Sequence, residues 1–125
     1  MQPRTYSFTN HFRQRFAERF GKKFGVDYND SFALNVCISR LINQAKPNRS
    51  FINNTEYMVY IHERYGADRR FEFLCNEGVV FVISPNDYVH GRNIWAVITC
   101  LEEKFTNVVI HKKFKKKELA EMTEF

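Results

Sequence analysis

Phenylalanine recurs at four-residue intervals near the start of the chain. The series is Phe8, Phe12, Phe16, Phe20 and Phe24. Side chains four residues apart lie on one face of a helix, so this spacing predicts a first helix whose aromatic face packs on a sheet. We expect an irregular lead-in over residues 1–8 and a helix end near Phe20. Ser7, Thr9 or Asn10 can cap the start of this helix.

A second amphipathic pattern follows Asp30, which is a good helix N-cap. The apolar positions in it are Leu34, Ile38, Leu41, Ile42 and Ala45. Their period of 3.6 residues predicts a helix over residues 31–45. Pro47 then ends the helical pattern, because proline disfavours a helical conformation at the residue before it.

The hydrophobic period changes to two in the middle of the chain, beginning with Tyr57, Val59 and Ile61. Alternation and apolar runs bounded by turn residues predict four strands. Their expected ranges are 57–62, 70–75, 79–83 and 94–101. Asn76-Glu77-Gly78 is a hairpin signal, and short links of this kind make neighbouring strands antiparallel.

These elements predict one α+β domain over residues 1–125. Two N-terminal helices would pack on a four-stranded antiparallel meander sheet. Residues 104–125 form a tail that is basic and then acidic, and it would add a short strand or a frayed, poorly ordered helix.

The composition fits a folded domain with a basic surface. Of the 125 residues, 44% are hydrophobic and 16% aromatic, which is enough apolar material for a core. The net charge of +5 favours partners such as RNA, DNA or an acidic protein. Ordinary solubility charge explains the same value equally well.

Cysteine usage indicates a reducing compartment. Cys37, Cys75 and Cys100 lie in apolar runs without a CxxC pair, which argues against a disulfide framework or a structural zinc site. The first residues lack the apolar core of a signal peptide, and no apolar run reaches the roughly 18 residues of a membrane span. We therefore expect a cytosolic protein without a cofactor, a metal or a membrane partner.

A basic row runs beside the phenylalanines: His11, Arg15 and Arg19 are also four residues apart. Histidine exchanges a proton near neutral pH, and arginine offers a fork of donors that fits phosphate oxygens. Metal-independent RNA cleavage needs a base, an acid and a cation, which such a row can supply. The alternative is a solvated basic face that pairs with Glu18.

Other basic residues are candidates for nucleic-acid contacts. They are Arg70 at the second strand, His90 and Arg92 in the loop before the last strand, and Lys112, Lys113, Lys115 and Lys116 in the tail. Loops often carry function, and clustered lysines strengthen binding to any polyanion. An ordinary polar loop and a solubilising tail account for the same residues. His62 and Arg64 would share one face at the end of the first strand, as plain strand-end charges.

The spacing His11-x3-Arg15-x3-Arg19, with Gly21 after it, resembles the opening helix of small proteins in the barnase, colicin and RelE-like superfamily. The closest likeness is to a widespread domain of unknown function in that group. That domain has a second helix and a four-stranded antiparallel sheet ending in a "vITv" strand. Residues 96–100, AVITC, stand where that strand would be.

Thr99 is the residue of this strand that matches the family's motif. The resemblance implies that Thr99 joins His11, Arg15 and Arg19 in a site for metal-independent RNA cleavage, because many members of the superfamily are toxins or phage effectors of this kind. The chain departs from the family in its long linker between the halves and in a tail after Leu101 that has no counterpart.

Three hypotheses follow. The first is an RNA-directed, metal-independent endoribonuclease of toxin or effector type, in which His11 is the acid or base, Arg15 and Arg19 bind phosphate and Thr99 orients it. The second is a non-catalytic factor of phage or mobile-element type that binds nucleic acid or a protein, such as an antitoxin or a host component, and inhibits or redirects it. The third is a structural homo-oligomer that uses an aromatic sheet face as its interface.

Overall fold

The computed structural model describes residues 4–48, 55–85 and 93–103. In chain order, the elements are β1 (Thr5–Phe8), α1 (Asn10–Phe24), α2 (Ser31–Asn43), β2 (Lys46–Pro47), α3 (Thr55–Tyr65), β3 (Glu72–Asn76), β4 (Val79–Pro85) and β5 (Ile94–Glu102). The α+β class is therefore confirmed. The four-stranded antiparallel meander is wrong, because the described residues form a mixed sheet of five strands.

The five strands lie side by side in the order β1-β5-β4-β3-β2. β1 runs parallel to β5, and the remaining neighbours are antiparallel. Glu77 and Gly78 link β3 to β4 as a two-residue hairpin, and both have positive φ angles of 49° and 84°. The hairpin predicted at this point is confirmed, and glycine suits the second of these positions.

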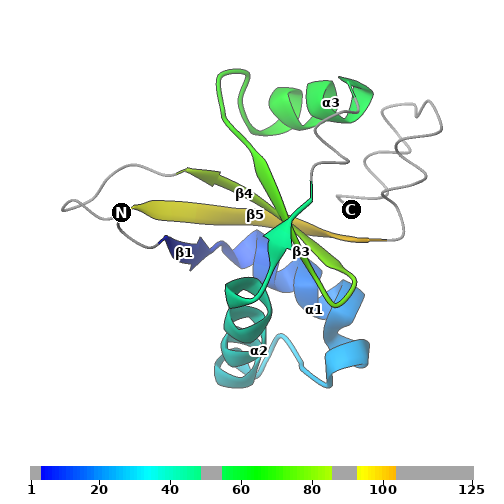
Figure 1. Cartoon of the computed structure of the whole chain (residues 1–125). Coiled ribbons are helices and arrows are strands. Elements are labelled where there is room, and N and C mark those ends of the chain that lie inside the picture. Colours follow the sequence, from blue (N-terminus) through cyan, green and yellow to red (C-terminus); the bar gives the residue numbers. More distant parts are fainter. Residues whose placement is uncertain (1–3, 49–54, 86–92, 104–125) are drawn as a thin grey trace.

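Helices cover both faces of the sheet: α1 and α2 lie on one side and α3 on the other (Figure 1). The larger cluster joins the α1 and α2 side chains to alternate residues of β3, β4 and β5, such as Phe81 and Val97. The smaller cluster joins α3 to the opposite residues of the same strands, such as Val82 and Ile98. β4 and β5 are therefore buried on both faces.

The aromatic face of α1 packs as the sequence predicts, with Phe12, Phe16 and Phe20 buried against the sheet. Thr9 is the N-cap: its Oγ1 accepts a hydrogen bond from the backbone N–H of Phe12 at 3.0 Å and donates one to the carbonyl of Val97 on β5 at 3.2 Å. The helix runs past the expected end at Phe20. None of the three described helices has the length and apolarity that a bilayer crossing requires.

The strand predicted over residues 57–62 is wrong, because this segment is helix α3. The buried side chains of α3 are Tyr57, Tyr60 and Ile61, while Val59 is 51% exposed. These buried positions are three and four residues apart, which is the spacing of a helix face. The aromatic and β-branched composition of the segment favoured a strand, and packing against the sheet decided otherwise.

The lead-in expected at residues 1–8 instead contains β1, which pairs with β5 from Thr5 opposite Ile94 to Phe8 opposite Val97. The second helix ends at Asn43, two residues before the expected end, and the N-cap role of Asp30 is confirmed by its bond from the N–H of Ala33 at 3.1 Å. The tail over residues 104–125 lies outside the described part of the chain.

Candidate functional site

The basic row of α1 lies along β5 and is largely covered. His11, Arg15 and Arg19 are all half-buried, and the side chain of Arg15 is only 12% exposed. Atoms within the row are shielded from solvent, including Nε2 of His11 and Nε of Arg15. The row is therefore partly covered by the rest of the protein and does not form an open, solvated face.

Each arginine of the row has a defined partner. Nη1 of Arg15 lies 2.8 Å from Oε2 of Glu18, which is the ion pair expected from their spacing. Nη1 of Arg19 donates to the backbone carbonyl of Cys100 on β5. Burial raises the pKa of the Cys100 thiol to about 12, although the nearby Arg19 and Arg15 oppose this rise. The two guanidinium groups therefore lie on the same side of β5 as this thiol.

Thr99 lies on the opposite side of β5. It pairs with Val82, which packs in the cluster beneath α3, and paired residues share a face. The register shifts at this point, because Val97 pairs with Ile83 and leaves Ile98 as an extra residue. Such a bulge puts Ile98 and Thr99 on the α3 face together. The sheet therefore separates Thr99 from the basic row on α1.

A hollow of about 270 Å³ opens at the C-terminal end of the row. One wall is α1, with Arg19, Phe20 and Lys23, and the other is formed by Gly78 of the hairpin together with Glu102 and Glu103 at the end of β5. Lys23 continues the row, because it follows Arg19 by four residues. Glu102 pairs with Val79 of the α1-side cluster, so its side chain shares that side of the sheet with the two cations. The Glu103 side chain instead hydrogen-bonds with the thiol of Cys75, which packs on the α3 side.

Hydrogen bonds join Lys23 of α1 and Glu103 at the end of β5 to the β3–β4 hairpin. Nζ of Lys23 donates to the carbonyl of Glu77 at 2.6 Å, and the backbone N–H of Glu103 donates to the carbonyl of Gly78 at 2.8 Å. A Cβ atom on Gly78 would lie 3.0 Å from Nζ of Lys23, so a larger residue there would press on this ammonium group. The hairpin therefore fixes the position of Lys23.

Three charged residues that line this hollow, Lys23, Glu102 and Glu103, were not predicted from the sequence. Lys23 carried a usable signal, since it extends the four-residue spacing of the row. Glu102 and Glu103 carried none, because only the path of β5 along α1 brings them opposite Arg19. The structure therefore joins Arg19 to new neighbours and leaves His11 outside the walls of the hollow.

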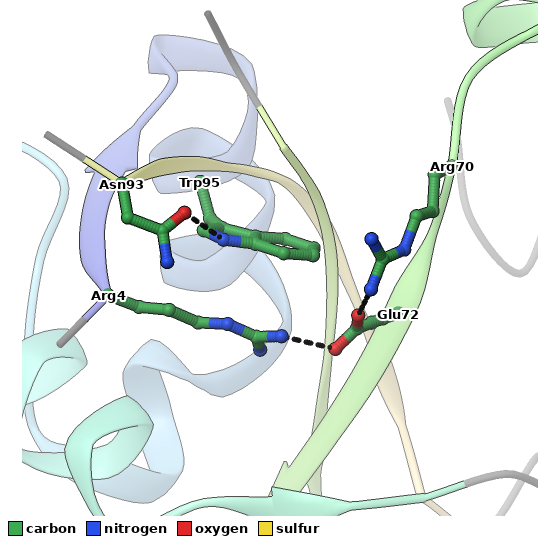
Figure 2. A network of polar contacts seen from close by, with 5 residues as sticks. All are labelled: Arg4, Arg70, Glu72, Asn93 and Trp95. Carbon is green, nitrogen blue, oxygen red and sulfur yellow. Dashed lines mark hydrogen bonds and ion pairs between the residues drawn. The ribbon is translucent and has the colours of Figure 1, made fainter. Parts of the chain in front are cut away.

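Arg70 belongs to a different polar network, at the other end of β5 (Figure 2). Its Nη2 lies 2.6 Å from Oε2 of Glu72, and Nη2 of Arg4 lies 2.8 Å from Oε1 of the same carboxylate. The Arg4 guanidinium stacks 3.9 Å from the centroid of the Trp95 ring, whose Nε1 donates to Oδ1 of Asn93 at 2.9 Å. This network links β1, β3 and β5, and Arg70 remains 67% exposed.

The other predicted nucleic-acid contacts cannot be placed. His90 and Arg92, together with Lys112, Lys113, Lys115 and Lys116, lie outside the described residues. His62, which was expected with Arg64 at the end of a strand, lies in helix α3. Its ring lies between two backbone carbonyls: Nδ1 is 2.7 Å from the oxygen of Met58, and Nε2 is 2.9 Å from the oxygen of Arg69. His62 therefore links the end of α3 to the chain before β3.

Over residues 4–48, 55–85 and 93–103, no three histidine, cysteine or acidic side chains gather in a group that could hold a metal ion. Comparison with protein-family models, curated proteins and solved structures gives no match to this chain. The resemblance to the barnase, colicin and RelE-like superfamily therefore stays a prediction.

Proposed function

We propose that the protein is an RNA-directed, metal-independent endoribonuclease of toxin or effector type, with the hollow as its phosphate site. The observation that carries this proposal is the position of Arg19 and Lys23 on one wall of the hollow and of Glu102 on the other. RNA cleavage without a metal needs a cation for the phosphoryl charge and a base for the 2′-hydroxyl, and both must reach the same substrate.

Lys23, which is exposed, would contact the scissile phosphate directly. Arg19, whose Nη1 is bonded to the Cys100 carbonyl and whose Nη2 is shielded, would add its positive charge from behind, and both charges favour the negative charge that develops on the phosphoryl oxygens. The carboxylate of Glu102 would take the proton of the 2′-hydroxyl. The 2′-oxygen then attacks phosphorus and the bond to the 5′-oxygen breaks, with a proton returned to the leaving oxygen. The products are a 2′,3′-cyclic phosphate and a 5′-hydroxyl.

Cleavage of labelled RNA in EDTA tests this proposal. We expect cleavage to survive chelation and to leave a cyclic phosphate. Glu102→Gln keeps the shape of the side chain but removes its basicity, so it should lower the cleavage rate by about 10²–10⁴-fold without weakening binding. Glu103→Gln is the matched control, because the Glu103 side chain bonds with the Cys75 thiol. A wild-type protein that neither binds nor cleaves RNA would contradict the proposal.

The variant Lys23→Gln distinguishes a specific phosphate contact from the effect of net charge on RNA binding. Loss of one phosphate contact should weaken RNA binding and reduce the slope of log affinity against log salt by about one. Lys22→Gln is the matched control, because Lys22 has the same charge, is also exposed and does not line the hollow. Equal effects of the two variants would show that only the net charge matters.

A second candidate function is non-catalytic binding of nucleic acid or of a protein partner. The observation that favours it is that the residues implied by the family resemblance do not form one site. Thr99 lies on the α3 face of the sheet, away from the basic row, and Nε2 of His11 is shielded from solvent. In that case RNA binds without being cleaved, and neither glutamate variant changes the product. The same EDTA assay therefore distinguishes the two functions.

A further inference from the structure

The outward face of α2 carries large apolar side chains in the open. Phe32 is 82% exposed, Val36 52% and Tyr28, just before the helix, 38%. Phe32 and Val36 are four apart on α2, so they form one stripe on the side of the helix that faces away from the core. Tyr28 lies in the turn before the helix, where its ring centroid is 5.5 Å from the guanidinium of Arg13. We call the stripe of Phe32 and Val36 the Phe32 patch. Figure 1 shows α2 at the lower edge of the molecule.

The patch lies in a sparsely charged stretch of the protein. Residues 26–45 contain Asp27, Asp30 and Arg40 as their charged residues, and no lysine, in a chain where 26% of residues are charged and the net charge is +5. Most of the outward side chains around the stripe are uncharged amides or hydroxyls. An apolar centre with few charges and a polar rim is typical of a protein interface and unsuited to RNA.

We propose that the Phe32 patch packs against the same patch of a second copy of this chain, with the two α2 helices antiparallel about a twofold axis. Charge complementarity selects this occupant. The acidic residues Asp27 and Asp30 lie at the N-terminal end of the stripe, and Arg40 lies about 15 Å further along the helix. An antiparallel pair brings Arg40 of each copy to the acidic end of the other, whereas a parallel pair would oppose like charges.

The spacing within the stripe suits this arrangement. With the twofold axis midway between Phe32 and Val36, each Phe32 packs on the Val36 of the other copy, and each Arg40 comes level with the other copy's Tyr28. An arginine beside a tyrosine ring adds a cation–π contact to the ion pair. Arg40 is half exposed, pairs with Glu77 through Nη1 at 3.0 Å and also hydrogen-bonds with the thiol of Cys37. A guanidinium has five N–H donors, which is more than these two contacts engage.

The contact involves one helix of 13 residues from each copy. This is a small interface, so we expect a weak dimer that forms at high protein concentration rather than an obligate one. The fold does not need the dimer, because the core-facing side of α2 is fully packed within one chain. Substitutions on the Phe32 patch should therefore leave the monomer folded.

Sedimentation velocity over a range of protein concentrations tests the proposal. The wild-type chain should move from monomer to dimer as its concentration rises. Phe32→Ser and Val36→Ser should each weaken the dimer by roughly tenfold or more, because they remove the apolar centre. Val59→Ser is the matched control, since Val59 is 51% exposed on α3. A wild-type chain that stays monomeric at millimolar concentration, or an equal loss in Val59→Ser, overturns the proposal.

A charge exchange tests the antiparallel arrangement. Arg40→Glu and Asp27→Lys should each weaken self-association, because each places like charges at both ends of the pair. An equal mixture of the two variants should restore dimers, since the introduced carboxylate then meets the introduced ammonium. A mixture that associates no better than either variant alone rules out this arrangement.

Discussion

At the scale of single residues, Gly21 marks the closest approach of α1 to the chain that follows it. A Cβ atom there would lie 2.6 Å from the carbonyl oxygen of Val26, which is a backbone atom and cannot swing away. We expect Gly21→Ala to lower the free energy of unfolding by about 1–3 kcal/mol through this overlap. Urea denaturation followed by circular dichroism measures the change.

Gly25 is the control for this prediction, because its constraint is conformational and not steric. Its φ of +69° is the left-handed C-cap of α1, and a Cβ atom added there would meet no other atom within 4 Å. Gly25→Ala should cost about 1 kcal/mol, and Gly25→Asn less, because asparagine tolerates this conformation better. A Gly21→Ala protein as stable as the wild type would contradict the close approach.

Sequence reasoning works for residues whose role is local. As caps, Asp30 and Thr9 accept from N–H groups three residues further on, so residue type and position predicted Asp30 directly and Thr9 as one of three candidates with Ser7 and Asn10. Thr99 shows the limit. Strict alternation from Trp95 and Val97 would put Thr99 on the α1 face, and the single extra residue at Ile98 moves it to the other face. A bulge depends on strand pairing, which no local pattern records.

At the scale of elements, α3 offers a direct test of helix against strand. A strand would place Val59 and Ile61 on the same face, whereas in the helix Ile61 is fully buried and Val59 is 51% exposed. We therefore expect Ile61→Ala to lower the free energy of unfolding by about 2–4 kcal/mol and Val59→Ala by less than about 0.5 kcal/mol. Thermal denaturation of both variants provides the measurement, and similar losses would favour the strand.

The hydrophobic periodicity of residues 57–62 fits both a strand and a helix. Tyr57 and Ile61 satisfy both a period of two and a helical period, so Val59 and Tyr60 alone distinguish the two structures.

β1 was not predicted, for a different reason. It has four residues and pairs with a strand that begins at Ile94, so its existence depends on a partner far away in the chain. The long apolar strands β4 and β5 were predictable because burial on both faces demands apolar runs.

At the scale of the whole molecule, β5 organises the polar features at its two ends. The hollow with Arg19 and Lys23 lies at one end, and the Arg4–Trp95 stack lies at the other. The row of His11, Arg15 and Arg19 could be predicted, because these residues share one face of one helix. The sequence could not predict Glu102 and Glu103 as neighbours of Arg19, because that contact requires the strand order and the path of β5 along α1.

The whole molecule also sets the response of stability to alkaline pH. In the folded protein burial raises the pKa of the Cys75 and Cys100 thiols from 9.0 to about 12, with Glu103 adding to the rise at Cys75. In the unfolded chain these thiols ionise near 9.0, so between pH 9.0 and about 12 the folded state binds more protons than the unfolded state. The free energy of unfolding should therefore fall as the pH rises through this window, and the thiols should contribute no pH dependence well below it.

Urea denaturation at a series of pH values, from neutral upward, measures this slope. Lysines and tyrosines titrate in the same window, so the thiol contribution is the difference between the wild type and a Cys75→Ser, Cys100→Ala double variant. The double variant is less stable at neutral pH, because Cys100 is fully buried and its removal leaves a cavity. Its stability should nevertheless fall less steeply above pH 9.0. Equal slopes in the two proteins would show that both thiols ionise as readily in the folded state as in the unfolded one.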